Sequence, residues 1–200
     1  CWYQIDSNDL GLSQFFRHLL VSVREKYPNF GTALDEISFQ RTSINPRSLA
    51  TELINEFIAE INDFTLLIFD DYHIVTEDIE IISFVEHLLE FLPDHIRIVI
   101  GSRSVYGIPT ALLYVNEELA IVNDEDLRFR ASEVRDLARK HFQIRLTNKQ
   151  AQDIIDQADG WIIAILLALR DGSLSISIPR LEGAREQVYD YLAKEVYDGL

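Results

Sequence analysis

An apolar run that ends in two aspartates constrains the fold of this 200-residue chain more than any other feature. Residues 64–70 have the sequence Phe-Thr-Leu-Leu-Ile-Phe-Asp and are followed at once by Asp71. A run that is apolar at nearly every position is typical of a parallel strand buried on both faces. In open parallel sheets, ligands bind beyond the carboxyl ends of the strands. The run therefore predicts an α/β protein with a carboxylate site at that edge of its sheet.

Strand and helix patterns alternate through the first part of the chain. Amphipathic helical spacing follows Phe15, Pro46 and Thr76, and Asn45-Pro46 has the form of an N-cap followed by proline at the first helical position. The predicted strands are residues 2–6, 64–70, 96–102 and 119–123. This alternation predicts a mostly parallel sheet with helices on both faces.

Beyond about residue 130 the strand patterns end and helical patterns follow one another. The predicted helices cover residues 132–142, 147–158 and 161–170, and Thr147 and Gln150 have the spacing of a capping box. A further helix is predicted at 184–197, after a segment rich in turn-forming residues. The sequence thus predicts a small helical appendage and a domain boundary near residue 173.

Charge argues against direct contact with nucleic acid. The formal net charge is −15, and residues 1–100 carry 17 acidic against 6 basic side chains. A surface of this sign repels phosphate backbones over about one Debye length, so we do not expect these residues to bind DNA or RNA. The alternative is that the charge merely keeps the domain soluble.

Several other classes of protein find no support in the sequence. Cys1 is the only cysteine, which excludes disulfides and thiolate zinc sites within the chain. No apolar run approaches the roughly 18 residues that span a bilayer, and the first residues lack the features of a signal peptide. We therefore expect a cytoplasmic protein without a membrane segment. The five histidines have no metal-ligand spacing.

The two aspartates and one arginine are the candidate site residues. One carboxylate of the Asp70–Asp71 pair could hold a hydrated magnesium ion, and the other could orient or deprotonate an attacking water. The alternative is that both aspartates only end a strand and begin a turn. Arg103 follows the strand predicted at 96–102, and its guanidinium suits the γ-phosphate of a nucleotide. The alternative is a surface arginine paired with an acid, and His73 is expected to be an exposed loop histidine.

Seven segments, in order along the chain, match one known series of motifs. Residues 67–73, Leu-Ile-Phe-Asp-Asp-Tyr-His, resemble a Walker B segment, and 98–103, Ile-Val-Ile-Gly-Ser-Arg, are similar to a sensor strand. The other matching segments are 2–6, 15–20, 126–129, 158–161 and 189–196. Together they resemble the MalT-like (LuxR-type) bacterial transcription regulators of the STAND class of P-loop ATPases. The loop Gly-x-x-x-x-Gly-Lys-[Ser/Thr] is absent.

The resemblance implies a fold class and a domain order. It implies a parallel three-layer, AAA-like P-loop NTPase sheet from which the first strand is missing, followed by a small helical lid and the start of a winged-helix segment. The implied domains are 1–128, a partial nucleotide-binding core, 129–173, the lid, and 174–200, the start of a winged-helix or linker helix. The phosphate-binding loop would precede Cys1, so these residues alone are expected to be catalytically inactive.

The resemblance also implies a switch that uses ATP, ADP and magnesium. Asp70 would coordinate magnesium through water, Asp71 would polarise the hydrolytic water, and Arg103 would sense the γ-phosphate. ADP would hold an inactive form, and ATP with a small-molecule inducer would open it for self-association and promoter activation. The inducer and DNA would bind through domains absent from this chain.

Two other functions remain open from the sequence. The chain could be a degenerate NTPase-fold scaffold that acts through protein contacts without nucleotide. It could also be a magnesium-dependent phosphotransfer protein in which Asp70 or Asp71 accepts the phosphate.

Overall fold

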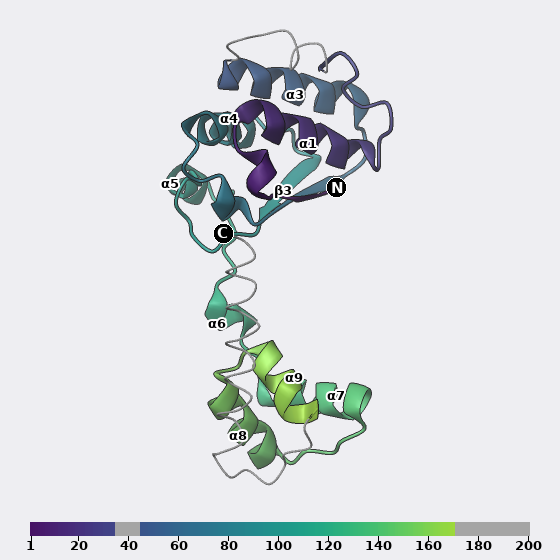
Figure 1. Cartoon of the computed structure of the whole chain (residues 1–200), viewed down its shortest axis with the longest axis vertical. Coiled ribbons are helices and arrows are strands. Elements are labelled where there is room, and N and C mark those ends of the chain that lie inside the picture. The colour runs from purple at the N-terminus through teal and green to yellow at the C-terminus, as the bar shows by residue number, and fades with distance from the viewer. Residues whose placement is uncertain (35–44, 171–200) are drawn as a thin grey trace. The chain divides into compact units, whose positions relative to one another are not determined.

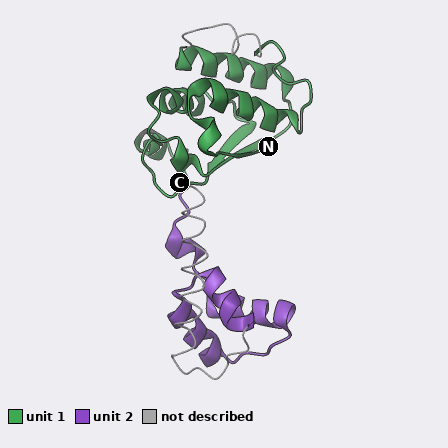
Figure 2. Ribbon diagram, viewed as in Figure 1, with its two compact units in different colours: residues 1–119 green, residues 120–200 purple. Residues whose placement is uncertain are grey.

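A computed structural model describes residues 1–34 and 45–170 of the chain (Figure 1). The chain forms two compact units, residues 1–119 and 120–200 (Figure 2). Each unit has its own cluster of buried apolar side chains. The boundary inferred at 128 stays a prediction, and the predicted winged-helix segment at 174–200 lies outside the described residues.

Unit 1 contains a parallel sheet of three strands. They are β1 (Trp2–Gln4), β2 (Thr65–Asp70) and β3 (Ile96–Ile100), in the spatial order β1-β2-β3. Ile68 is in register with Trp2 on one side and with Val99 on the other. The prediction of a mixed α/β fold with a parallel sheet is confirmed.

The strand predicted at residues 119–123 is wrong, because these residues have no strand structure. The side chains of Ile121 and Val122 are 57% and 67% exposed. A short apolar run forms a strand only where a neighbouring strand satisfies its backbone N–H and C=O groups. In the described part of the chain, the sheet ends at β3.

Three helices lie on the same side of the sheet: α1 (Leu12–Arg24), α3 (Pro46–Glu60) and α4 (Ile79–Glu90) (Figure 1). The side chain of Asn45 caps α3 by accepting a hydrogen bond from the Ser48 amide at 3.1 Å, with Pro46 at the first helical position. Asp78 caps α4 through the amides of Glu80 and Ile81. Both helices thus start where a side-chain oxygen satisfies the first free amides.

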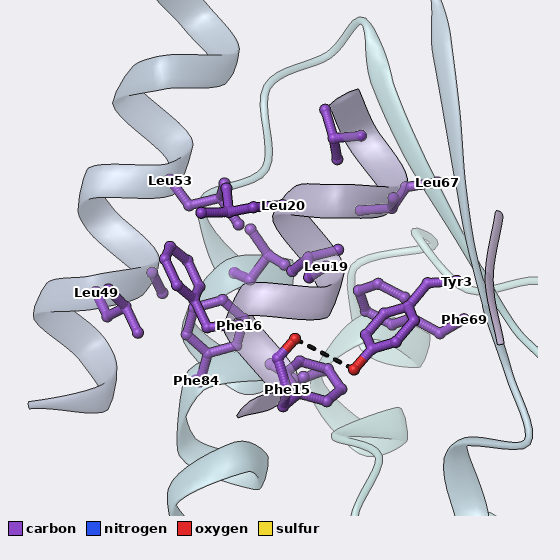
Figure 3. Close-up of a cluster of buried hydrophobic side chains, with 14 of the residues drawn as sticks. Tyr3, Phe15, Phe16, Leu19, Leu20, Leu49, Leu53, Leu67, Phe69 and Phe84 are labelled. Atoms are coloured by element: carbon purple, nitrogen blue, oxygen red, sulfur yellow. Dashed lines mark hydrogen bonds between the residues drawn. The ribbon is translucent and has the colours of Figure 1, made fainter. Parts of the chain in front are cut away.

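Aromatic rings join these helices to the sheet (Figure 3). The Phe15 ring lies 5.9 Å from the Phe69 ring and 6.1 Å from the Phe84 ring, both edge-on. The Tyr3 hydroxyl donates a hydrogen bond to the Phe15 carbonyl at 3.2 Å. The labelled members of this core are Tyr3, Phe15, Phe16, Leu19, Leu20, Leu49, Leu53, Leu67, Phe69 and Phe84. The core therefore fixes the strands from one side only.

The other face of the sheet carries apolar side chains that the described residues do not cover. Trp2, Leu66 and Val99 are 56%, 39% and 46% exposed, and they alternate along their strands with buried or half-buried residues. Side chains of a strand alternate between the two faces of its sheet. The described residues therefore supply two of the three predicted layers.

Three short elements complete the described part of unit 1: η1 (Ser7–Asp9), η2 (Tyr72–Ile74) and α5 (Thr110–Val115). Unit 2 contains α6 (Asp124–Leu127), α7 (Ala131–Phe142), α8 (Asn148–Ala158) and α9 (Ile162–Arg170). Thr147 and Gln150 form the predicted capping box before α8. The helices predicted in this region are confirmed with small changes in their bounds. The predicted helix at 184–197 lies outside the described residues.

Two of the segments that carry the family resemblance contact each other within unit 2. Arg128 forms a bidentate ion pair with Asp159, with N···O distances of 2.7 and 3.1 Å. The Phe129 amide donates to the Gly160 carbonyl at 3.0 Å. Gly160 has a φ of +72°, and a Cβ atom there would lie 2.9 Å from the Arg128 Cβ. Only glycine combines this backbone conformation with so close an approach.

The aromatic core of unit 1 makes a direct prediction about stability. Phe15→Ala should lower the free energy of unfolding by about 3–5 kcal/mol, because it leaves a cavity among fully buried rings. Val21 lies in the same helix, and its side chain is 53% exposed. Val21→Ala should therefore change the free energy of unfolding by less than about 0.5 kcal/mol. Chemical denaturation of both variants tests this, and equal losses would contradict the assigned core.

Candidate functional site: the acidic edge of the sheet

The turn after β2 is held by both neighbouring strands. Gly101, just after β3, donates its amide to the Phe69 carbonyl at 2.8 Å, and the Gly101 carbonyl accepts from the Tyr72 amide at 3.0 Å. On the β1 side, the Ile5 amide donates to the Asp70 carbonyl at 3.1 Å. Residues 70–72 therefore continue the hydrogen-bond pattern of the sheet beyond the end of β2, which leaves the two aspartates little backbone freedom.

Tyr72 anchors this turn in the core. Its side chain is fully buried, and its ring stacks on the Phe69 ring with centroids 6.5 Å apart. Burial raises the pKa of the Tyr72 hydroxyl, with smaller contributions from the negative charges of Glu86 and Asp78. The hydroxyl donates to the Gly107 carbonyl at 3.4 Å. A buried ring at this position fixes the direction in which the preceding residues leave the strand.

Asp71 adopts the left-handed backbone conformation, with φ 54° and ψ 34°. A residue other than glycine in this region costs about 1 kcal/mol and persists only where its surroundings impose it. Here the surroundings are the buried Tyr72 ring on one side and, on the other, the Asp70 backbone, whose carbonyl accepts a hydrogen bond from the Ile5 amide. The conformation is what turns the chain at the carboxyl end of β2.

Asp70 faces the position of Gly101. Its Oδ1 atom accepts a hydrogen bond from the Asp71 amide at 3.0 Å, and the residue is half-buried. A Cβ atom at position 101 would lie 2.9 Å from this oxygen, closer than such atoms approach in proteins. The absence of a side chain at Gly101 therefore makes the room in which the Asp70 carboxylate lies.

Asp71 makes its contacts on the opposite side, toward β1. Its Oδ2 atom accepts a hydrogen bond from Gln4 Nε2 at 2.6 Å, and its Oδ1 atom lies 3.7 Å from His73 Nδ1. The Asp71 side chain is 40% exposed. The structure thus places both aspartates at one edge of the sheet, one beside each flanking strand.

Two residues at this edge differ from the expectation: Gln4 was not predicted as part of the site, and His73 is more buried than predicted. Only 23% of the His73 side chain is exposed, and its Nδ1 atom is buried and lacks a hydrogen bond. The prediction of an exposed loop histidine is therefore wrong, because the η2 turn folds the ring back beside Asp71. A signal for Gln4 exists only in the strand register, which pairs it with Asp70.

Arg103 lies in the bend after β3, two residues beyond Gly101, and its side chain is exposed. The structure describes no hydrogen bond or ion pair of its guanidinium with residues 1–34 or 45–170. The predicted alternative of a surface ion pair with an acid is thus not formed in that part of the chain. Serine side chains order the loop around it, since the Ser102 hydroxyl donates to the Ser104 carbonyl at 2.6 Å.

Residues 1–34 and 45–170 contain neither a cluster of metal-ligating side chains nor a helix that could span a membrane. They contain no group of three or more histidine, cysteine, aspartate or glutamate side chains that could hold a metal ion. Nor does any helix described there have the length and apolar character needed to cross a bilayer. Among the described residues, the acidic edge therefore does not offer the three or more ligating side chains that would hold an ion by themselves. Magnesium keeps several of its waters and needs only one or two carboxylates.

The fold and the site together define a class: a parallel α/β unit with an acidic pair at the carboxyl end of its central strand, connected to a helical unit. No family model matches the chain. Comparison with curated proteins nevertheless finds relatives over its full length.

One relative is the serine/threonine-protein kinase PknK of Mycobacterium tuberculosis, 30% identical over 207 residues that cover 100% of this chain and 18% of that protein. The HTH-type transcriptional regulator MalT of Cronobacter sakazakii is 28% identical over 100% of this chain and 22% of its own length. MalT of Vibrio parahaemolyticus is 26% identical over 98% and 22%. These similarities fit a MalT-like regulator at the level of the family. The chain spans only 18% to 22% of the length of these relatives.

The close approach of Gly101 and Asp70 can be tested by a double-mutant cycle. Gly101→Ala should lower the free energy of unfolding by about 1–2 kcal/mol, because the new methyl group displaces the Asp70 carboxylate from its hydrogen bond. In an Asp70→Ala background the same change should cost less than about 0.5 kcal/mol. Equal costs in the two backgrounds, measured by chemical denaturation, would show that the contact is not formed.

Proposed function

We propose that this chain is the nucleotide-binding segment of a signal-dependent ATPase that switches a transcription regulator between two forms. ADP favours the inactive form, and ATP favours a self-associating form. The observation that carries the proposal is the acidic pair at the carboxyl end of the central strand, with Asp70 beside Gly101 and Asp71 beside Gln4. The curated relatives named as HTH-type transcriptional regulators support the regulatory part.

The Asp70 carboxylate suits a magnesium ion that keeps its water shell. Asp70 is half-buried at the ligand-binding edge of a parallel sheet, and its carboxylate lies in the room left by the absence of a side chain at Gly101. One carboxylate that accepts hydrogen bonds from metal-bound water is enough to position such an ion. Magnesium bound with the nucleotide would neutralise phosphate charge, and the part of Asp70 is to hold its water ligands in place.

Asp71 is assigned to the water that attacks the terminal phosphate. Its side chain is 40% exposed and makes no cap hydrogen bond to the helical turn that follows, and its left-handed backbone directs it out of the strand. A carboxylate within hydrogen-bond distance of a water can orient it and accept its proton. Arg103, which follows β3 two residues beyond Gly101 and forms no hydrogen bond or ion pair with residues 1–34 or 45–170, is assigned to the γ-phosphate oxygens.

The remaining contacts to phosphate are assigned to residues outside this sequence. The 200 residues contain no Gly-x-x-x-x-Gly-Lys-[Ser/Thr] loop. The same holds for the inducer and for promoter DNA, which the proposal assigns to other parts of the full-length protein. The second candidate is a scaffold with an NTPase fold that binds partners without nucleotide.

Substitution of Asp71 in the full-length protein tests the proposal. Asp71→Asn should slow ATP hydrolysis at least about 100-fold, because it removes the proton acceptor. The Kd for ATP should change less than about twofold, because the phosphate contacts remain. Steady-state hydrolysis and nucleotide titration measure the two effects.

Asp63→Asn is the matched control, since Asp63 is an exposed acid just before the amino end of β2. It should leave both quantities unchanged. Hydrolysis by Asp71→Asn at the rate of the parent protein would remove the role assigned to Asp71. A parent protein that binds no ATP would favour the scaffold.

A further inference from the structure

The carboxylate of Asp71 is held by a side chain from another strand. Gln4 is the last residue of β1 and is in register with Asp70, so its side chain and that of Asp70 are on the same face of the sheet. The Nε2 atom of Gln4 donates to Asp71 Oδ2 at 2.6 Å. This contact joins residues that are far apart in the sequence at the point where β2 turns.

The hydrogen bond restricts the side-chain torsions of Asp71, which the backbone conformation alone does not fix. The left-handed conformation sets the direction of the Cα–Cβ bond, but rotation of a carboxylate about Cβ–Cγ is only weakly restricted. A donor on Oδ2 restricts that rotation. The other oxygen, Oδ1, lies 3.7 Å from His73 Nδ1, which is too far for a hydrogen bond. Oδ1 can therefore accept a hydrogen bond from a water molecule.

The chemistry of an amide suits this task. Gln4 is neutral, so it directs the carboxylate without neutralising its negative charge. A lysine at the same place would form an ion pair with Asp71 and reduce its capacity to accept a proton. A glutamate would repel it, and a methionine of similar length would offer no donor.

We propose that Gln4 is a positioning residue: its amide holds Asp71 so that Oδ1 is presented to the water that attacks a nucleotide's terminal phosphate. This inference rests on the proposed function. Gln4 acts through Asp71 and does not itself contact the reacting atoms. A merely structural role would be to tie β1 to the turn, and that role predicts effects on stability without a specific effect on hydrolysis.

A kinetic double-mutant cycle in the full-length protein separates the two roles. Gln4→Met should lower kcat for ATP hydrolysis about 10- to 100-fold, because a carboxylate free to rotate is rarely in position. KM for ATP should change less than about twofold. In the Asp71→Asn background, Gln4→Met should have no further effect on kcat, since the group that it positions is already gone.

Gln14→Met serves as the matched control, since Gln14 is an exposed glutamine in the first turn of α1. It should leave kcat and KM unchanged. The melting temperature of Gln4→Met should fall by less than about 3 °C, because an exposed hydrogen bond contributes little to stability.

The outcomes distinguish this inference from the proposed function. If Asp71→Asn slows hydrolysis and Gln4→Met does not, the role of Gln4 is overturned and the proposed function stands. If Gln4→Met lowers kcat equally in both backgrounds, Gln4 does not act through Asp71, and the inference is again overturned. If the parent protein hydrolyses no ATP, or Asp71→Asn hydrolyses at the parental rate, the proposed function fails and the inference fails with it.

Discussion

The hydrogen bonds that continue the sheet past the end of β2 determine the geometry of the acidic edge. Gly101 accepts and donates on one side of the turn, and Ile5 donates on the other. Without them, residues 70–72 would be an ordinary exposed turn in which two adjacent carboxylates repel and move independently. With them, the Asp70 carboxylate lies beside β3 and that of Asp71 beside β1. The two different roles proposed for the acids, magnesium binding by Asp70 and orientation of the attacking water by Asp71, rest on this separation.

The aromatic core below the sheet supports the same edge. Phe69 contacts Tyr3, Phe15 and Tyr72, so one buried ring connects β1, α1 and the η2 turn. A close-packed interior transmits small displacements, because it contains few voids that could absorb them. Both Phe69 and Tyr72 are fully buried. Displacements of α1 or β1 would therefore reach the aspartates through these two rings.

Local signals in the sequence were enough to predict the parallel strands β1, β2 and β3, the caps of α3 and α8, and the helices α7, α8 and α9. Such features depend on residues close in the chain. The failed strand at 119–123 shows the limit of the same reasoning, since a strand also needs a partner. Gln4 and Gly101 could not be identified in advance, because their importance depends on the register between strands that are distant in sequence. The ring orientation of His73 depends likewise on the turn imposed by Asp71 and Tyr72.

An ATP titration of the full-length protein with and without Mg²⁺ tests whether the acidic edge binds magnesium together with a nucleotide, as proposed. We expect Mg²⁺ to lower the Kd for ATP of the parent protein. In Asp70→Asn the factor by which Mg²⁺ lowers this Kd should be at least about tenfold smaller, a difference of about 1.4 kcal/mol. If the ATP affinity of Asp70→Asn responds to Mg²⁺ as strongly as that of the parent protein, Asp70 does not hold the magnesium ion.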